Sequence, residues 1–198
     1  MKLFALTIVH KSTSKAKLLK ASNDLSSFGY FQRSSVKEFM DFTCKIVVER
    51  TASCSRSSVK EQEYMFHVFV RADGLSGVLI SDSEYPPRVS FTLLSKVLDE
   101  FTAKYPASTW NSLVENQVEF KPCDEYLARY QNPKEADAMM KLQTDLDETK
   151  IILHDCLEGV LQRGENLDNL IEKSEGLSMQ SKTFYKTAKK TNQCCVIL

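Results

Sequence analysis

The sequence has no apolar run long enough to cross a membrane and no excess of charge of one sign. Its longest aliphatic runs, at residues 46–48 and 78–80, are far shorter than the roughly 20 residues of a transmembrane helix. The 26 basic and 26 acidic side chains cancel, which argues against a nucleic-acid binder. Alternating apolar and polar residues at the N-terminus indicate a strand and not a signal peptide. We therefore expect a cytoplasmic protein without a nucleic-acid partner.

Motifs for metal binding and catalysis are missing as well. The six cysteines include no C-x-x-C pair and the three histidines are scattered, so the sequence predicts no zinc site. None of the six glycines belongs to a G-x-x-x-x-G-K-[ST] loop, which excludes a small GTPase, an enzyme class of similar length with C-terminal cysteines. We predict no catalytic residue, no metal ligand and no cofactor-binding residue.

Residues 1–106 alternate between strand and helix patterns. Period-two alternation predicts strands at 2–10, 17–21, 63–71 and 75–81, and Asp73-Gly74 predicts a hairpin between the last two. Helical spacing predicts one helix from Ser35, with Ser35 and Glu38 as a capping box, and a second helix after Pro86-Pro87. The polar stretch 51–58 breaks the pattern, and residues 124–130 suit a short helix. The predicted fold class is α+β, around an antiparallel sheet.

Beyond residue 133 the pattern becomes a heptad repeat. From 139 to 191 one frame of alternating three- and four-residue steps selects mostly apolar side chains, and as a helix this stretch would be about 80 Å long. Such a seam needs partner helices, and we expect the segment to be disordered or folded back without them. Its predicted apolar layers are Met139, Leu142, Leu146, Leu153, Val160, Leu167, Leu170, Leu177 and Phe184.

Arg163 occupies the middle of this frame, between Val160 and Leu167. An arginine in the core of a helical bundle is costly unless it is fully partnered, but polar seam residues define register and composition. The stretch Gly159-Val160-Leu161-Gln162-Arg163-Gly164-Glu165-Asn166-Leu167 resembles the centre of a vesicle-type R-SNARE motif. Over essentially its whole length the chain resembles the prenylated longin-domain R-SNAREs, lipid-anchored synaptobrevin homologues.

The resemblance implies a domain order and a function. It implies a profilin-like longin domain at 1–131, a linker at 132–137, and a SNARE coiled-coil helix with a lipidation tail at 138–198. Arg163 would be the central layer, facing glutamines of three Q-SNARE helices, which suits the several donors of a guanidinium. Zippering from residue 139 towards 191 would dock and fuse vesicles in secretory-pathway transport (ER–Golgi, Golgi or endosomal/vacuolar). A longin-type adaptor or a non-fusogenic inhibitory SNARE remains the alternative.

The last residues predict covalent lipids and no dissociable cofactor. Cys195 with residues 196–198 fits the C-a-a-X prenylation box, and Cys194 offers a palmitoylation or second prenylation site. Leu198 favours geranylgeranyl by rule, whereas the resembling family is known for farnesyl. Two lipids anchor a protein stably, whereas a single lipid binds reversibly.

Charge is unevenly distributed near the C-terminus. Residues 182–198 contain four lysines and no acidic residue, whereas residues 133–181 carry 5 basic and 11 acidic side chains. The predicted lipid sites therefore follow a basic stretch. We expect the cytoplasm and the cytosolic face of Golgi and vesicle membranes.

Two further sets of residues are candidates for regulation. Longin domains of the resembling family fold back on their own SNARE motifs, so Phe39, Phe42 and Ile46 are predicted to form an autoinhibitory groove for that motif or the lipid. Ser174 and Ser181 lie on the heptad frame, where phosphorylation would place about −1.5 to −2 charges in a layer. They are otherwise small packing residues.

Overall fold

The computed structural model describes residues 1–193, except for 14, 62, 133–134, 136–137 and 139–149. Its centre is a six-stranded sheet of order β2-β1-β5-β4-β3-β6. The first five strands pair antiparallel, and β6 joins the free edge of β3 in parallel. The strands are β1 (Leu3–Lys11), β2 (Ala16–Asn23), β3 (Ser55–Glu61), β4 (Tyr64–Val70), β5 (Leu75–Asp82) and β6 (Ile151–His154).

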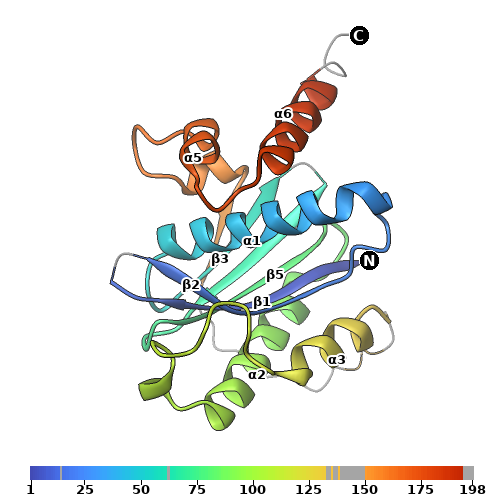
Figure 1. Ribbon diagram of the computed structural model, residues 1–198. Helices are drawn as coiled ribbons and strands as arrows, with labels where there is room; N and C mark the ends of the chain where they lie inside the picture. The colour runs from blue at the N-terminus through green and yellow to red at the C-terminus, as the bar shows by residue number, and fades with distance from the viewer. Residues whose placement is uncertain (14, 62, 133–134, 136–137, 139–149, 194–198) are drawn as a thin grey trace.

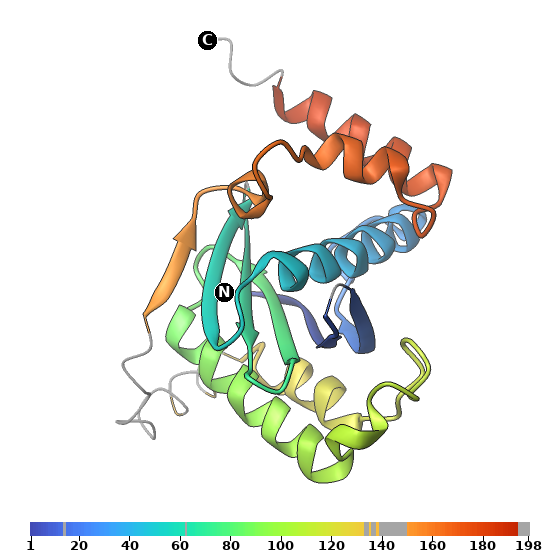
Figure 2. The same cartoon turned by 90° about the vertical axis from the view of Figure 1, so that its left-hand side faces the viewer.

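Helices cover both faces of this sheet (Figures 1 and 2). One face carries α1 (Arg33–Arg50), and the other carries α2 (Pro87–Lys104) and α3 (Lys121–Arg129). Figure 2 shows α5 (Leu167–Lys173) and α6 (Met179–Gln193) on the outer side of α1, away from α2 and α3. Short 3-10 turns are η1 (Tyr30–Gln32), η2 (Ala107–Thr109) and η3 (Leu157–Val160). The α+β prediction is confirmed.

Two apolar cores result, one on each face of the sheet. The α2 core holds the α2 stripe and the fully buried Trp110, Phe120 and Cys123 from the stretch after α2. The α1 core, beneath α1, contains Phe4, Val36 and Met40 and extends into the C-terminal residues. Both faces of β1 and β5 are therefore buried, which is why these strands are apolar on both sides.

Two local predictions are wrong. The stretch predicted as a polar break contains most of β3, which pairs with a strand on each edge, and its serines Ser57 and Ser58 are almost fully buried. The predicted capping box does not form: α1 begins at Arg33 after Gln32, without a side-chain cap. Ser35 is buried, and Glu38 accepts hydrogen bonds from the C-terminal part of the chain.

The long SNARE helix is not the form that the structure adopts between residues 151 and 193. We call these residues the C-terminal segment; they form β6, η3, α5 and α6, joined by turns, and fold back over α1 and β3. An isolated helix would leave its apolar stripe in water, whereas folding back buries that stripe against the same chain. Of the two states expected without partners, the folded-back one is observed here.

Candidate functional site

The C-terminal segment completes the α1 core. Its side chains Leu157, Val160, Leu167, Ile171 and Leu177 are each at most 9% exposed and belong to that core. Full burial of such a side chain contributes about 1.5–3 kcal/mol relative to exposure. The interface is therefore apolar at its centre, with polar contacts arranged around it.

The first polar contact is a strand addition at the edge of β3. Residues 151–154 pair in parallel with 56–59, which satisfies backbone groups that an edge strand would otherwise present to solvent. Just beyond β6, the Leu157 N–H donates to Glu61 Oε2 at 3.0 Å. This bond leads the chain from the sheet edge into η3, where Leu157 enters the α1 core.

The second contact joins the end of α1 to the turn that contains Arg163. The Arg50 guanidinium donates to both carboxylate oxygens of Glu165, with Nε–Oε2 at 2.8 Å and Nη2–Oε1 at 2.6 Å. This hydrogen-bonded pair lowers the pKa of the Glu165 carboxyl. Gly164 has a φ of +90°, a left-handed conformation that glycine adopts without strain, and it lets the chain turn here. Arg163 itself is exposed, so it makes no buried contact in the folded-back form.

The third contact lies where α6 begins. Glu38 Oε2 accepts from the Ser178 N–H at 3.0 Å and from Ser181 Oγ at 2.6 Å. The Ser178 hydroxyl in turn donates to Ser181 Oγ at 3.0 Å. Ser181 is fully buried, and its hydrogen bond is the main reason why the pKa of Glu38 is lowered. A single carboxylate thus holds the N-terminal end of α6 against α1.

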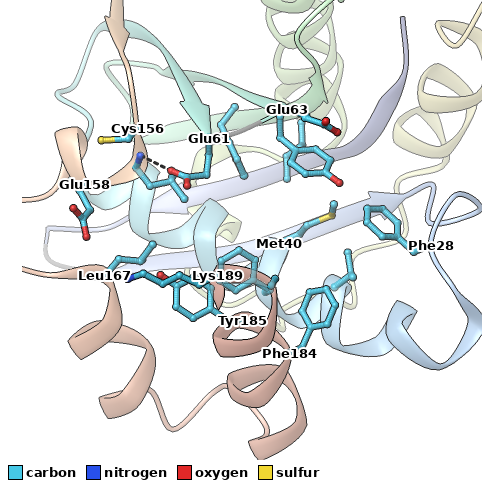
Figure 3. A pocket seen from close by; sticks show the side chains of 17 residues that line it. Phe28, Met40, Glu61, Glu63, Cys156, Glu158, Leu167, Phe184, Tyr185 and Lys189 are labelled. Atoms are coloured by element: carbon cyan, nitrogen blue, oxygen red, sulfur yellow. Dashed lines mark hydrogen bonds between the residues drawn. The ribbon is translucent and has the colours of Figure 1, made fainter. Parts of the chain in front are cut away.

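A cavity of about 880 Å³ opens between α6, α1 and the β3–β4 hairpin (Figure 3). Phe39 stacks on Tyr185 with ring centroids 5.4 Å apart, and the Tyr185 hydroxyl donates to Asp168. The volume falls in the range of about 300–1,000 Å³ that is typical of small-molecule sites. Apolar side chains form most of its wall, and carboxylates of the hairpin lie near them: Phe28, Val36, Met40, Tyr64, Phe66, Ile80, Leu157, Leu167, Phe184 and Ala188, with Glu61 and Glu63.

The predicted groove is divided between the two sides of α1. Phe39 lines the large cavity, but Phe42 and Ile46 line a smaller one of about 470 Å³, together with Ser174 and Gly176. The three predicted residues thus line two cavities, and each cavity also includes residues of the C-terminal segment. Asp41 borders the smaller cavity, and burial raises the pKa of its carboxyl to about 6.

The predicted layer residues take different positions in this form. Val160, Leu167 and Leu177 are buried, Leu170 and Phe184 are partly buried, and Leu153 is 69% exposed. Ser181 is buried and Ser174 is partly buried. Met139, Leu142 and Leu146, and the cysteines Cys194 and Cys195, lie outside the described residues.

Three side chains outside the predicted apolar layers also contribute to this interface. Leu157 and Ile171 are buried, Tyr185 is partly buried, and they recur at 14-residue intervals. On the heptad frame each follows a layer residue directly, which places the three in one stripe beside the seam. The repeat of large apolar residues at this position, directly after the layers, is the sequence pattern from which a second binding face could have been predicted.

The sequence carries two family matches that correspond to these two parts. Residues 25–127 match the model of the longin family, described as a regulated-SNARE-like domain, and residues 138–197 match the synaptobrevin model. The chain belongs to the longin-domain R-SNAREs. The synaptobrevin homologue ykt6 of Schizosaccharomyces pombe is 51% identical over 197 residues, and YKT6 of Saccharomyces cerevisiae is 47% identical over 200. Each alignment covers 100% of both chains.

Membership in this family settles the general activity. R-SNAREs are non-enzymatic proteins of vesicle traffic that interact with other SNAREs, as predicted. No helix among the described residues is both long and apolar enough to span a membrane. For this R-SNARE, the site is thus the surface on which the longin domain holds its own SNARE motif.

Proposed function

We propose that this R-SNARE alternates between the folded-back form and a four-helix bundle with three Q-SNARE helices, whose zippering fuses vesicles with target membranes of the secretory pathway. The supporting observation is the double use of the same side chains. Val160, Leu167 and Leu177 are heptad layers, and they are buried in the α1 core. They cannot occupy both places, so the longin domain competes with the partner helices.

Arg163 provides a test of the bundle that does not disturb the folded-back form. Because its side chain is exposed there, we expect Arg163→Ala to leave the protease sensitivity of residues 151–193 unchanged. We expect the same variant to assemble with three Q-SNARE helices at least tenfold more weakly, because three glutamines would lose their shared donor. Gln162→Ala, at the exposed neighbouring position, is the control. Equal assembly of the two variants would contradict the central-layer role.

A longin-type adaptor or inhibitory SNARE would also bind Q-SNAREs, but it would not merge bilayers. A liposome fusion assay with the full chain anchored on one vesicle population and Q-SNAREs on the other separates the two functions. Lipid mixing supports the fusogenic function. Assembly without mixing, under conditions where an established R-SNARE gives mixing, would favour the inhibitor.

Covalent lipids complete the proposal. We assign prenylation to Cys195 and a second lipid to Cys194, which would place the protein on the cytosolic face of Golgi and vesicle membranes. Ala188, seven residues before Cys195, lines the large cavity. Most of the cavity wall is apolar and its volume is in the size range of ligand sites, so it suits an isoprenoid chain when the protein is not on a membrane.

Phosphorylation of Ser181 would act on the contact with Glu38. The serine oxygen lies 2.6 Å from the carboxylate, so an added negative group would convert an attraction into repulsion. We expect Ser181→Asp to make residues 178–193 more sensitive to protease and to impair layer packing with Q-SNAREs. Gln180→Asp, at an exposed position, is the control, and Ser174→Asp tests the second serine. Normal SNARE assembly of Ser181→Asp would contradict the switch.

A further inference from the structure

The basic end of α6 is neutralised by the acidic side of α5 in the folded-back form. Lys186 Nζ lies 2.8 Å from Glu172 Oε1, and Lys189 Nζ lies 2.7 Å from Asp168 Oδ2. Lys182 donates to the Glu172 backbone oxygen at 2.9 Å. The ion pairs are also why the pKa values of Asp168 and Glu172 are lowered. Three of the four lysines that precede the terminal cysteines thus have partners within the C-terminal segment.

These contacts require the turn between α5 and α6. They join residues separated by 14 and 21 positions. On one continuous helix, the same residues would lie about 21 Å and about 32 Å apart along the axis. No side chain reaches that far, so the ion pairs belong to the folded-back form and are lost when the SNARE motif becomes a single helix.

The heptad frame shows where the released lysines would lie. Lys182, Lys186 and Lys189 fall at positions b, f and b when Ser181 is at position a. These positions are on the outer side of a helical bundle, away from the layers. Lys190 follows at position c and is already exposed. The four lysines would thus form one basic outer face in the helix turns before the lipid sites.

We propose that this basic face is a binding surface for anionic lipid, which the acidic residues Asp168 and Glu172 cover until the SNARE motif leaves the longin domain. The inference rests on the proposed opening of the folded-back form and adds its consequence for the membrane. A lysine near an anionic leaflet strengthens membrane partitioning by roughly fivefold. Exposed ion pairs are weak and screened by salt, so an anionic surface can compete with them. Anionic membranes would therefore favour the open form at the site where fusion takes place.

The test uses the full chain with Cys194→Ser and Cys195→Ser, so that no lipid anchor contributes. Vesicles of phosphatidylcholine with phosphatidylserine are compared with vesicles of phosphatidylcholine alone. Asp168→Asn with Glu172→Gln frees the lysines, and we expect roughly 25-fold stronger partitioning onto the anionic vesicles, reduced by added salt. The matched control is Asp155→Asn with Glu175→Gln, which also removes two negative charges, but from exposed carboxylates outside these ion pairs. Equal partitioning of the two double variants would overturn the proposal.

A second pair of variants separates this inference from the proposed opening. Ile171→Asn removes a buried contact of the folded-back form without changing charge. We expect this variant to become protease-sensitive and to bind anionic vesicles more strongly. Adding Lys186→Gln and Lys189→Gln to Ile171→Asn should remove the increase in vesicle binding and leave the protease sensitivity unchanged. Opening without added binding would refute the masked lipid surface and leave the proposed function intact. Unchanged protease sensitivity would instead count against the proposed opening.

Discussion

Replacing Ile171 with asparagine should release the C-terminal segment from the longin domain. Ile171 is 1% exposed in the α1 core, and the change removes apolar contacts while burying an amide without partners. Truncating a buried isoleucine alone costs about 2–5 kcal/mol, which corresponds to at least thirtyfold in the balance of closed and open forms. Limited proteolysis of residues 151–193 should become faster to that extent, and binding to Q-SNARE helices should become faster as well.

Leu153→Asn is the reciprocal control. Leu153 is a layer residue of the heptad frame, but its side chain is 69% exposed in the folded-back form. We expect this variant to keep the normal proteolysis pattern and to weaken assembly with Q-SNAREs. The sole tryptophan, Trp110, is buried in the α2 core on the opposite face, so its fluorescence reports whether the longin domain stays folded. An unchanged proteolysis rate in Ile171→Asn, together with native Trp110 fluorescence, would show that the packed C-terminal segment is not the autoinhibitory element.

Replacing Cys195 with serine should remove the protein from membranes entirely. Prenylation of the C-a-a-X cysteine needs its thiol, and each buried CH₂ of a lipid chain contributes about 0.8 kcal/mol of membrane affinity. Cell fractionation and flotation should find Cys195→Ser only in the cytosolic fraction. Cys194→Ser should retain the prenyl group and distribute between the two fractions, because one lipid chain binds only reversibly.

Cys54→Ser provides the matched control for this loss. Cys54 is an exposed free thiol of the longin domain, remote in sequence from the C-a-a-X box. It should fractionate like the unmodified sequence. Membrane-bound Cys195→Ser protein would show that the anchor lies elsewhere, and mass spectrometry of the C-terminal peptide would identify which isoprenoid Cys195 carries.

Local patterns were sufficient for most of the longin domain. The hairpin at Asp73-Gly74 and the helix after Pro86-Pro87 were predictable because turn chemistry and helical starts depend on neighbouring residues. β3 was missed because its serines resemble those of a polar loop, whereas strand pairing on both edges and burial in the sheet depend on residues distant in sequence. Glu38 matched a capping motif, but in the folded chain its carboxylate accepts hydrogen bonds from Ser178 and Ser181 instead.

The α+β class and the heptad seam centred on Arg163 could be predicted from spacing along the chain. The family and the lipidation signal were indicated by short motifs that resemble known ones. How the seam is buried in the single chain depends on long-range contacts, which the tertiary structure shows. The structure places β6 on the edge of β3 and a cavity beside Phe39 and Tyr185, and it shows ion pairs between acidic residues of α5 and lysines of α6. Apolar periodicity specifies that a face must be buried, but several surfaces can bury it. In the single chain the longin domain is the available surface, and the folded-back form uses it.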